Sequence, residues 1–286
     1  MVRLESEAKI VGTNKGTPWL QFVYRSIELN LHRIEDSRIQ LANALLWRGF
    51  FAGTDDTGVL IYRGNQKADR MDLKTLSRLL TFTPADEDGV IARVSPEANN
   101  QARWLQQIRA ILRLPSPSGM TAAGIRYTSW ASFQNCRFGY GLPVIELDLG
   151  VSLLVRTLPL VSVPTRLSGH GVSEPRLYIE FDGAYAACWF KYLFENHLSQ
   201  HLQRPDVFRI DLSRETGRLV IGREASSNDD AVASFQAAQD LARLLLDERL
   251  AGRLRRLKQA VCSQLNDCPG VNRFYQKCCQ MSALSM

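Results

Sequence analysis

The chain has 286 residues, of which 45% are hydrophobic and 22% are charged. These proportions exclude a disordered chain and a collagen-like repeat, and the length suffices for one large domain or two ordinary ones. The formal net charge is +6, and 28 arginines against 7 lysines carry the positive charge. Arginine makes forked contacts with carboxylates and phosphates, although a GC-rich bacterial genome produces the same excess.

The first sixteen residues lack the charged-then-apolar order of a secretory signal. The most apolar stretch, LGVSLLVRTLPLV, is too short to span a bilayer and contains Arg156. The six cysteines are scattered and form no CxxC motif. Together these features predict a cytoplasmic protein with reduced thiols and no structural disulfide.

The first part of the chain predicts a mixture of strands and helices. Alternation of Ile27, Leu29 and Leu31 with polar residues predicts a half-buried strand, and EDSRIQLANALLWRGF predicts the helix after it. VLIY and GVIARV read as strands, with a short helix, MDLKTLSRLL, between them. Ser95 and Pro96 predict the start of a further helix.

A segment rich in proline, serine and glycine, Leu114 to Gly124, follows that helix. Such a composition resists packed periodicity, so it predicts a domain boundary. The expected units are an N-terminal α+β subdomain, residues 1–114, and a C-terminal α+β domain, residues 125–286.

The second half contains five strand candidates rich in valine, isoleucine and leucine. They are PVIELDL, SLLVRTLPLV, RLYIEFD, VFRIDLS and GRLVIG. The segment SVPTRLSGHGVSEP predicts a long loop, Gly183 to Gln203 a helix, and the leucines from about residue 230 to 265 one long basic amphipathic helix. The predicted fold class is therefore α+β, with a mixed or antiparallel sheet in the second half, flanking helices and a long C-terminal helix. The glycine-rich loop of a doubly wound nucleotide fold is missing.

Acidic residues lie two apart on the predicted strands, where they share a face. Glu146 with Asp148 and Glu180 with Asp182, together with His170, are weak catalytic candidates that could hold a divalent cation or act as acid and base. Restriction-type nucleases place a lysine two residues after the second acid, where this chain has glycine. The alternative is the ordinary polar face of a half-buried sheet.

His197 and His201 stand four residues apart, which places both imidazoles on one face of a continuous helix. The arrangement resembles half of a zinc site. The glutamate that follows the first histidine in a zinc protease is missing, and no third ligand stands nearby in the sequence. We therefore predict no metal at this pair and no cofactor.

The predicted C-terminal helix carries a group of basic residues that could contact phosphates. Arg249, Arg253 and Arg256 follow one another in steps of four and three, which predicts a stripe along one helix face. The full group is Arg249, Arg253, Arg255, Arg256 and Lys258, with a second, weaker basic face through Arg109 and Arg113 in the first half.

These features favour a non-catalytic nucleic-acid-binding or nucleoprotein-assembly component that contacts DNA or RNA through arginine-rich helices. A metal-dependent hydrolase or nuclease that uses the acids and histidines is the first alternative. The second is a protein-interaction subunit, or a homo-oligomer, that docks through its C-terminal helix. No membrane partner is predicted.

Overall fold

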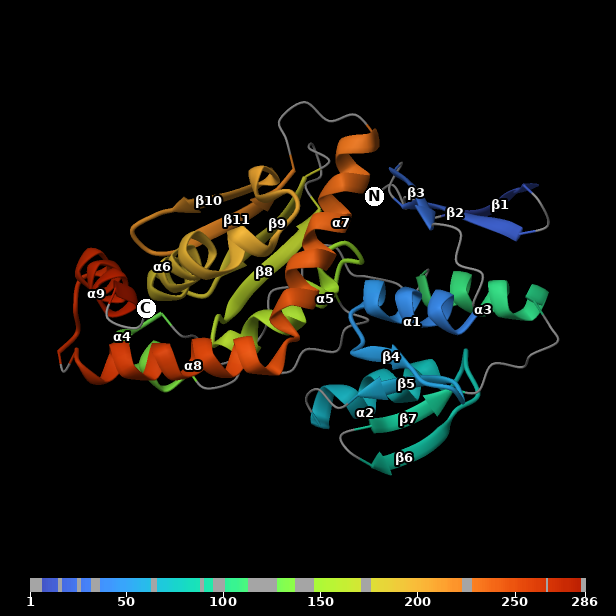
Figure 1. Ribbon diagram of the computed structural model, residues 1–286, viewed down its shortest axis with the longest axis horizontal. Helices are drawn as coiled ribbons and strands as arrows, with labels where there is room; N and C mark the ends of the chain where they lie inside the picture. Colours follow the sequence, from blue (N-terminus) through green and yellow to red (C-terminus); the bar gives the residue numbers. More distant parts are fainter. Residues whose placement is uncertain are drawn as a thin grey trace.

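The computed structural model describes residues 7–14, 17–24, 27–31, 37–62, 66–87, 90–94, 101–112, 128–136, 147–170, 176–222, 228–265 and 267–283. Within these ranges the chain combines helices with antiparallel sheets (Figure 1), which confirms the predicted α+β class. Three sheets are present, one of three strands and two of four.

The first third of the chain forms two of these sheets. The three-stranded sheet has the order β1-β2-β3, and the four-stranded sheet has the order β4-β5-β7-β6. Their strands are β1 (Glu7–Asn14), β2 (Thr17–Tyr24), β3 (Ile27–Leu31), β4 (Ala52–Thr54), β5 (Val59–Tyr62), β6 (Thr83–Glu87) and β7 (Val90–Val94). The sequence predicts β3, β5 and β7, whose apolar residues alternate or form short runs.

Three helices accompany these sheets: α1 (Ser37–Arg48), α2 (Gln66–Leu76) and α3 (Gln101–Leu112). Helix α1 buries Leu41, Ala44 and Leu45. Their spacing of three and four residues puts these apolar side chains on one helix face. Figure 1 shows α1 and α3 lying next to each other beside β4. All three helices match segments that the sequence predicts to be helical.

The second four-stranded sheet has the order β10-β11-β9-β8, and all of its pairings are antiparallel. Its strands are β8 (Thr165–His170), β9 (Leu177–Phe181), β10 (Phe208–Leu212) and β11 (Gly217–Ile221). Helix α6 (Ala184–Leu193) packs on one face of this sheet. The contact is so close that a Cβ atom at Gly217 would stand 2.5 Å from the Cβ of Ala187.

Beyond α6 the helix changes its winding instead of continuing to Gln203 as an α-helix. It passes into a π-turn, η3 (Phe194–Leu198), and then into a 3-10 turn, η4 (Ser199–His201). A second short turn, η5 (Pro205–Val207), leads into β10.

The structure corrects two predictions between residues 147 and 170. The segment SLLVRTLPLV is not a strand, because it forms α5 (Ser152–Thr157) and the 3-10 turn η2 (Leu158–Val161). Most of its side chains are buried, so its apolar residues run without the period of a half-exposed helix. The predicted loop that follows contains β8, and the described part of PVIELDL forms a turn.

The C-terminal helix predicted over residues 230–265 is two helices, α7 (Asn228–Leu245) and α8 (Glu248–Ser263). The chain turns sharply between them (Figure 1), and the carboxylate of Asp247 accepts the backbone N–H groups of Arg249 and Leu250 as the N-cap of α8. An aspartate at this position stabilises a helix start, which explains the break. The last helix, α9 (Val271–Ala283), packs against α6 and α8.

One hydrophobic core extends through both predicted units. Trp47 of α1 stacks on Phe235 of α7 with ring centroids 6.0 Å apart. Arg156 of α5 donates to the carboxylate of Asp72 in α2 over 3.3 Å, and both side chains are largely shielded from water. The boundary segment itself lies outside the described residues, so the position of the boundary stays a prediction.

Candidate functional site

Helix α8 has a buried face and an opposite, basic face. Ala251, Leu254 and Val261 point into the core, and their spacing of three and seven residues puts them on one side. Arg249, Arg253 and Arg256 are exposed. At 100° per residue they lie on the other side of the helix, so they form the stripe that the sequence predicts. We call these three residues the arginine stripe.

The guanidinium groups of the arginine stripe are available to a ligand. Within the described part of the chain, no hydrogen bond or ion pair joins any of the three to another side chain. By contrast, Arg204 lies 3.6 Å from Asp206, and Arg218 makes an ion pair with Glu180. The stripe therefore differs from Arg204 and Arg218, whose charges are balanced locally.

Lys258 does not belong to this basic surface, which corrects the prediction. It is only 3% exposed, because it falls on the buried side of α8 with Leu254 and Val261. Its Nζ donates to the carbonyls of Phe133 over 2.7 Å and Cys136 over 3.1 Å. Burial lowers the pKa of Lys258 to about 8. A side chain so enclosed cannot reach a phosphate on the protein surface.

Lys258 instead anchors a short helix, α4 (Trp130–Asn135), to α8. The two carbonyls that it binds lie at the C-terminal end of α4, where unpaired carbonyls attract a positive charge. The ammonium also stands 4.0 Å from the centroid of the Phe133 ring. Trp130 and Phe133 of α4 pack in turn against Tyr185 of α6.

The remaining predicted basic residues are placed less favourably than the stripe. Arg255 lies on the flank of α8, is half-buried and has other contacts. Arg109 of α3 is half-buried, and its Nε is enclosed without a hydrogen-bond partner. Arg113 lies outside the described residues. The structure therefore leaves three of the predicted basic residues on one accessible surface.

His197 stands near this surface but not beside His201 on one helix face. The four-residue spacing predicts one shared face for a continuous α-helix, whereas this segment is wound as a π-turn that contains His197, followed by a 3-10 turn that contains His201. The Nε2 of His197 lies 3.1 Å from the hydroxyl of Tyr192, whereas His201 is exposed. Burial, and secondly the charge of Arg253, lowers the pKa of His197.

Among the acidic candidates that the structure describes, no three converge on one site. Glu180 lies on the face of the sheet opposite α6 and pairs with Arg218. Asp182 lies beyond the end of β9 and is buried, and buried Asp148 lies in the turn before α5 instead of on a strand. Because Asp182 leaves the strand, it does not share a face with Glu180 as predicted.

Glu146 lies outside the described residues, as does the side chain of His170, whose backbone belongs to β8. Among the side chains that the structure describes, no group of three or more histidines, cysteines, aspartates or glutamates could hold a metal ion. The described geometry therefore gives the hydrolase hypothesis no assembled site.

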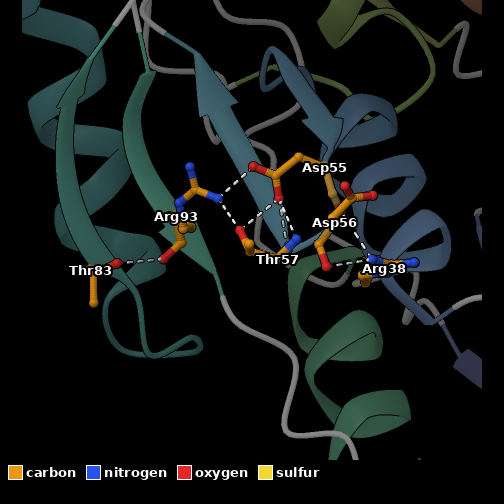
Figure 2. Close-up of polar contacts among 7 residues, drawn as sticks. Arg38, Asp55, Asp56, Thr57, Thr83 and Arg93 are labelled. Atoms are coloured by element: carbon orange, nitrogen blue, oxygen red, sulfur yellow. Dashed lines mark hydrogen bonds and ion pairs between the residues drawn. The ribbon is translucent and has the colours of Figure 1, made fainter.

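A second polar cluster, at the turn between β4 and β5, has a structural role (Figure 2). The carboxylate of Asp55 accepts the backbone N–H groups of Thr57 and Gly58 over 2.8 and 2.9 Å, and it pairs with Arg93 of β7 over 2.5 Å. Arg38 of α1 donates to the carbonyls of Asp55 and of the next residue over 3.0 Å. The bonds from Thr57 lower the pKa of Asp55 to about 2. Its oxygens are engaged within the turn, so the cluster fixes the loop.

All six cysteines, which the sequence predicts to be reduced, are free thiols. Most are enclosed by α6, α8 and α9, and burial raises the pKa of Cys188 to about 12 and of Cys262 to about 11. Thiols with a raised pKa are poor nucleophiles at neutral pH, so the four buried cysteines act as small apolar core residues.

Comparisons of the chain with protein-family models, with curated proteins and with solved structures give no match. No helix within the described ranges is both long and apolar enough to cross a membrane.

Proposed function

We propose that this protein binds nucleic acid without catalysing a reaction on it, and that the arginine stripe of α8 contacts the phosphate backbone. One observation carries the proposal: three exposed guanidinium groups lie on one helix face and have no acidic partner among the described residues. An exposed cation without an acidic partner contributes favourable binding free energy when it contacts a phosphate, because binding releases the counterions condensed on the nucleic acid.

The geometry of the stripe suits a polyanion better than a single small anion. From Arg249 to Arg256 the stripe extends about 10 Å along the helix axis, at about 1.5 Å per residue. Duplex DNA carries about six phosphate charges over that length, counting both strands. Contacts of this kind position a protein on the backbone and read no base sequence, so we propose binding with little sequence preference.

The surroundings of the stripe also favour an anion. The N-terminal end of α8 carries the positive pole of the helix dipole next to Arg249, although Asp247 and Glu248 offset part of it. The half-buried imidazole of His197 contributes little charge at neutral pH, because burial lowers its pKa. The attraction at neutral pH therefore comes mainly from the three guanidinium groups.

The test is the triple variant Arg249→Gln, Arg253→Gln and Arg256→Gln, assayed by fluorescence anisotropy with labelled duplex DNA and single-stranded RNA. We expect an affinity loss of at least about tenfold near 50 mM salt, because three phosphate contacts are removed. Folding should be unchanged, since exposed substitutions usually shift stability by less than about 0.5 kcal/mol.

A second triple variant, Arg204→Gln, Arg214→Gln and Arg218→Gln, is the matched control. It removes the same formal charge from exposed positions near β10 and β11, away from α8. Its affinity should stay close to that of the wild type. An equal loss in both variants would indicate that net charge alone drives binding, and a changed oligomeric state in the stripe variant would favour the protein-interaction alternative.

A further inference from the structure

Strand β10 is an edge strand among the described residues. It stands last in the sheet order β10-β11-β9-β8, and no described strand pairs with its other edge. Figure 1 draws it as the outer strand of the sheet, with α6 across one face. Unpaired edges present a row of backbone donors and acceptors that another strand can bind.

The hydrogen bonds of the β10–β11 hairpin fix which backbone groups point outward. The N–H of Ser213 donates to the carbonyl of Thr216, and the N–H of Gly222 donates to the carbonyl of Val207, each over 2.8 Å. Hydrogen-bonded pairs recur at every second residue of an antiparallel ladder. The backbone N–H and C=O groups of Arg209 and Asp211 therefore bond to β11. The N–H and C=O groups of Ile210 and Leu212 therefore point away from the sheet.

The side chains of β10 form a pattern that complements itself when the strand direction is reversed. Phe208, Ile210 and Leu212 lie on the face toward α6, and Leu212 is still 44% exposed. Arg209 and Asp211 lie on the other face, where they form an ion pair with each other over 3.1 Å and keep side chains that are 50% and 52% exposed. Read in either direction, the strand is apolar, charged, apolar, charged and apolar, with opposite charges at equivalent distances from Ile210.

We propose that β10 is a self-association surface, at which β10 of a second copy pairs antiparallel about a two-fold axis through Ile210. In this register Arg209 faces Asp211 of the second copy on one side of the axis, and Asp211 faces Arg209 on the other. Phe208 faces Leu212, and the outward N–H and C=O groups of the two Ile210 residues bond to each other. The two sheets then continue as one.

A second copy satisfies this edge better than an arbitrary peptide, because the register uses both charges and the outward backbone groups together. The N–H of Phe208 already bonds to the carbonyl of Pro205. At each end of the pairing the carbonyl of Phe208 therefore accepts the outward N–H of Leu212 of the second copy, and the pairing goes no further. A contact limited to one short strand buries less area than a stable interface, so the dimer is weak and concentration-dependent. It does not involve α8, which lies at the other side of α6 (Figure 1), so the inference is independent of the proposed function.

The test reverses one charge in each of two variants and then mixes the variants. In Arg209→Asp the paired positions carry only acids, and in Asp211→Arg they carry only bases, so each variant alone should dimerise at least about tenfold more weakly than the wild type. An equimolar mixture of the two restores both opposite-charge pairs. We expect sedimentation velocity between about 10 µM and 1 mM to show a wild-type dimer, two weakened variants and a heterodimer in the mixture.

A backbone variant checks the same edge without changing charge. Leu212→Pro removes an outward N–H and leaves the β11 ladder intact, so it should abolish the dimer, whereas Leu212→Ala keeps that N–H and should retain most of the association. Circular dichroism confirms that each variant is folded. A wild type that stays monomeric throughout, a mixture without heterodimer, or a Leu212→Pro variant that still dimerises would each overturn the proposal.

Discussion

Lys258 shows how one residue can look like part of a binding surface and yet belong to the core. Its charge is solvated by two carbonyls at the end of α4 instead of by water. Its position three and four residues from Val261 and Leu254 already places it on the apolar side of α8. That spacing is a sequence signal, because the helix face of a basic residue, and not its presence in the helix, decides whether its charge reaches the surface.

The buried ammonium gives a pH-dependent prediction at the scale of this residue. The pKa of Lys258 is about 8 in the folded protein and 10.5 in its ordinary state, because burial disfavours the charge. Between these values the unfolded chain binds more protons than the folded one, so the free-energy cost of burying the ammonium falls and the stability of the fold rises with pH. The unfolding free energy of the wild type minus that of Lys258→Met should increase from pH 7.5 to pH 10.

Urea unfolding at several pH values measures this difference, which should grow by about 1 to 3 kcal/mol. Lys74→Met, at an exposed position of α2, is the control and should show no such trend. A difference that is flat, or that shrinks as pH rises, would contradict the buried position of Lys258.

At the scale of elements, the sequence predicts those segments whose apolar residues keep a clear period. Strands β9 and β11 and helix α1 match their predicted ranges because each has one buried side, and β10 matches because its apolar residues alternate with charged ones. The run from Ser152 to Val161 is wrongly predicted, since a helix buried on nearly all sides has the same composition as a buried strand. Strand β8 was missed because RLSGH has few apolar residues and takes its conformation from pairing with β9.

The candidate site likewise has features that the sequence predicts and features that it does not. The spacing of Arg249, Arg253 and Arg256 predicts one helix face, and the structure places all three there. The pairs of acids could share a face only if the predicted strands reached Asp148 and Asp182, but Asp148 lies in a turn and Asp182 lies beyond the end of β9. The free edge of β10 could not be predicted, because it depends on the order of strands that are distant in the sequence.

Two glycine-to-alanine substitutions should change the stability of the protein in opposite directions. Gly252 lies within α8, and an added Cβ would meet only the ends of arginine side chains, at 3.6 Å or more. Gly252→Ala should therefore stabilise the protein by about 0.5 to 1 kcal/mol, because it reduces the entropy of the unfolded chain. Gly217→Ala should destabilise it by about 1 to 3 kcal/mol, because the new Cβ overlaps Ala187 of α6.

Thermal unfolding compares the two variants directly. Gly270→Ala serves as the control for Gly217→Ala, since nothing lies within 4 Å of its added Cβ. A stable Gly217→Ala protein would show that α6 does not pack as closely on β11 as described.

At the scale of the whole molecule, the two predicted units are joined by a shared core and by a buried ion pair. Asp72 and Arg156 have side chains that are 1% and 10% exposed, and they come from α2 and α5. The guanidinium of Arg156 also lies 4.9 Å from the centroid of the Phe51 ring. The units should therefore unfold together.

Removing one partner of this pair leaves the other charge buried. We expect Asp72→Leu to lower the unfolding free energy by about 3 kcal/mol or more, and Asp72→Leu with Arg156→Met to recover part of that loss. Asp206→Leu, which breaks the exposed pair with Arg204, should cost less than about 1 kcal/mol. Equal costs for Asp72→Leu and Asp206→Leu in urea unfolding would contradict a buried link between the units.

The central claim, that the arginine stripe contacts phosphates, is tested most directly by the salt dependence of binding to duplex DNA. The slope of log affinity against log salt concentration counts the phosphates neutralised, at about 0.9 per contact. The triple variant of Arg249, Arg253 and Arg256 should reduce the steepness of the wild-type slope by about 2 to 3, and the control variant of Arg204, Arg214 and Arg218 should leave it unchanged. A stripe variant that keeps the wild-type slope would contradict the claim.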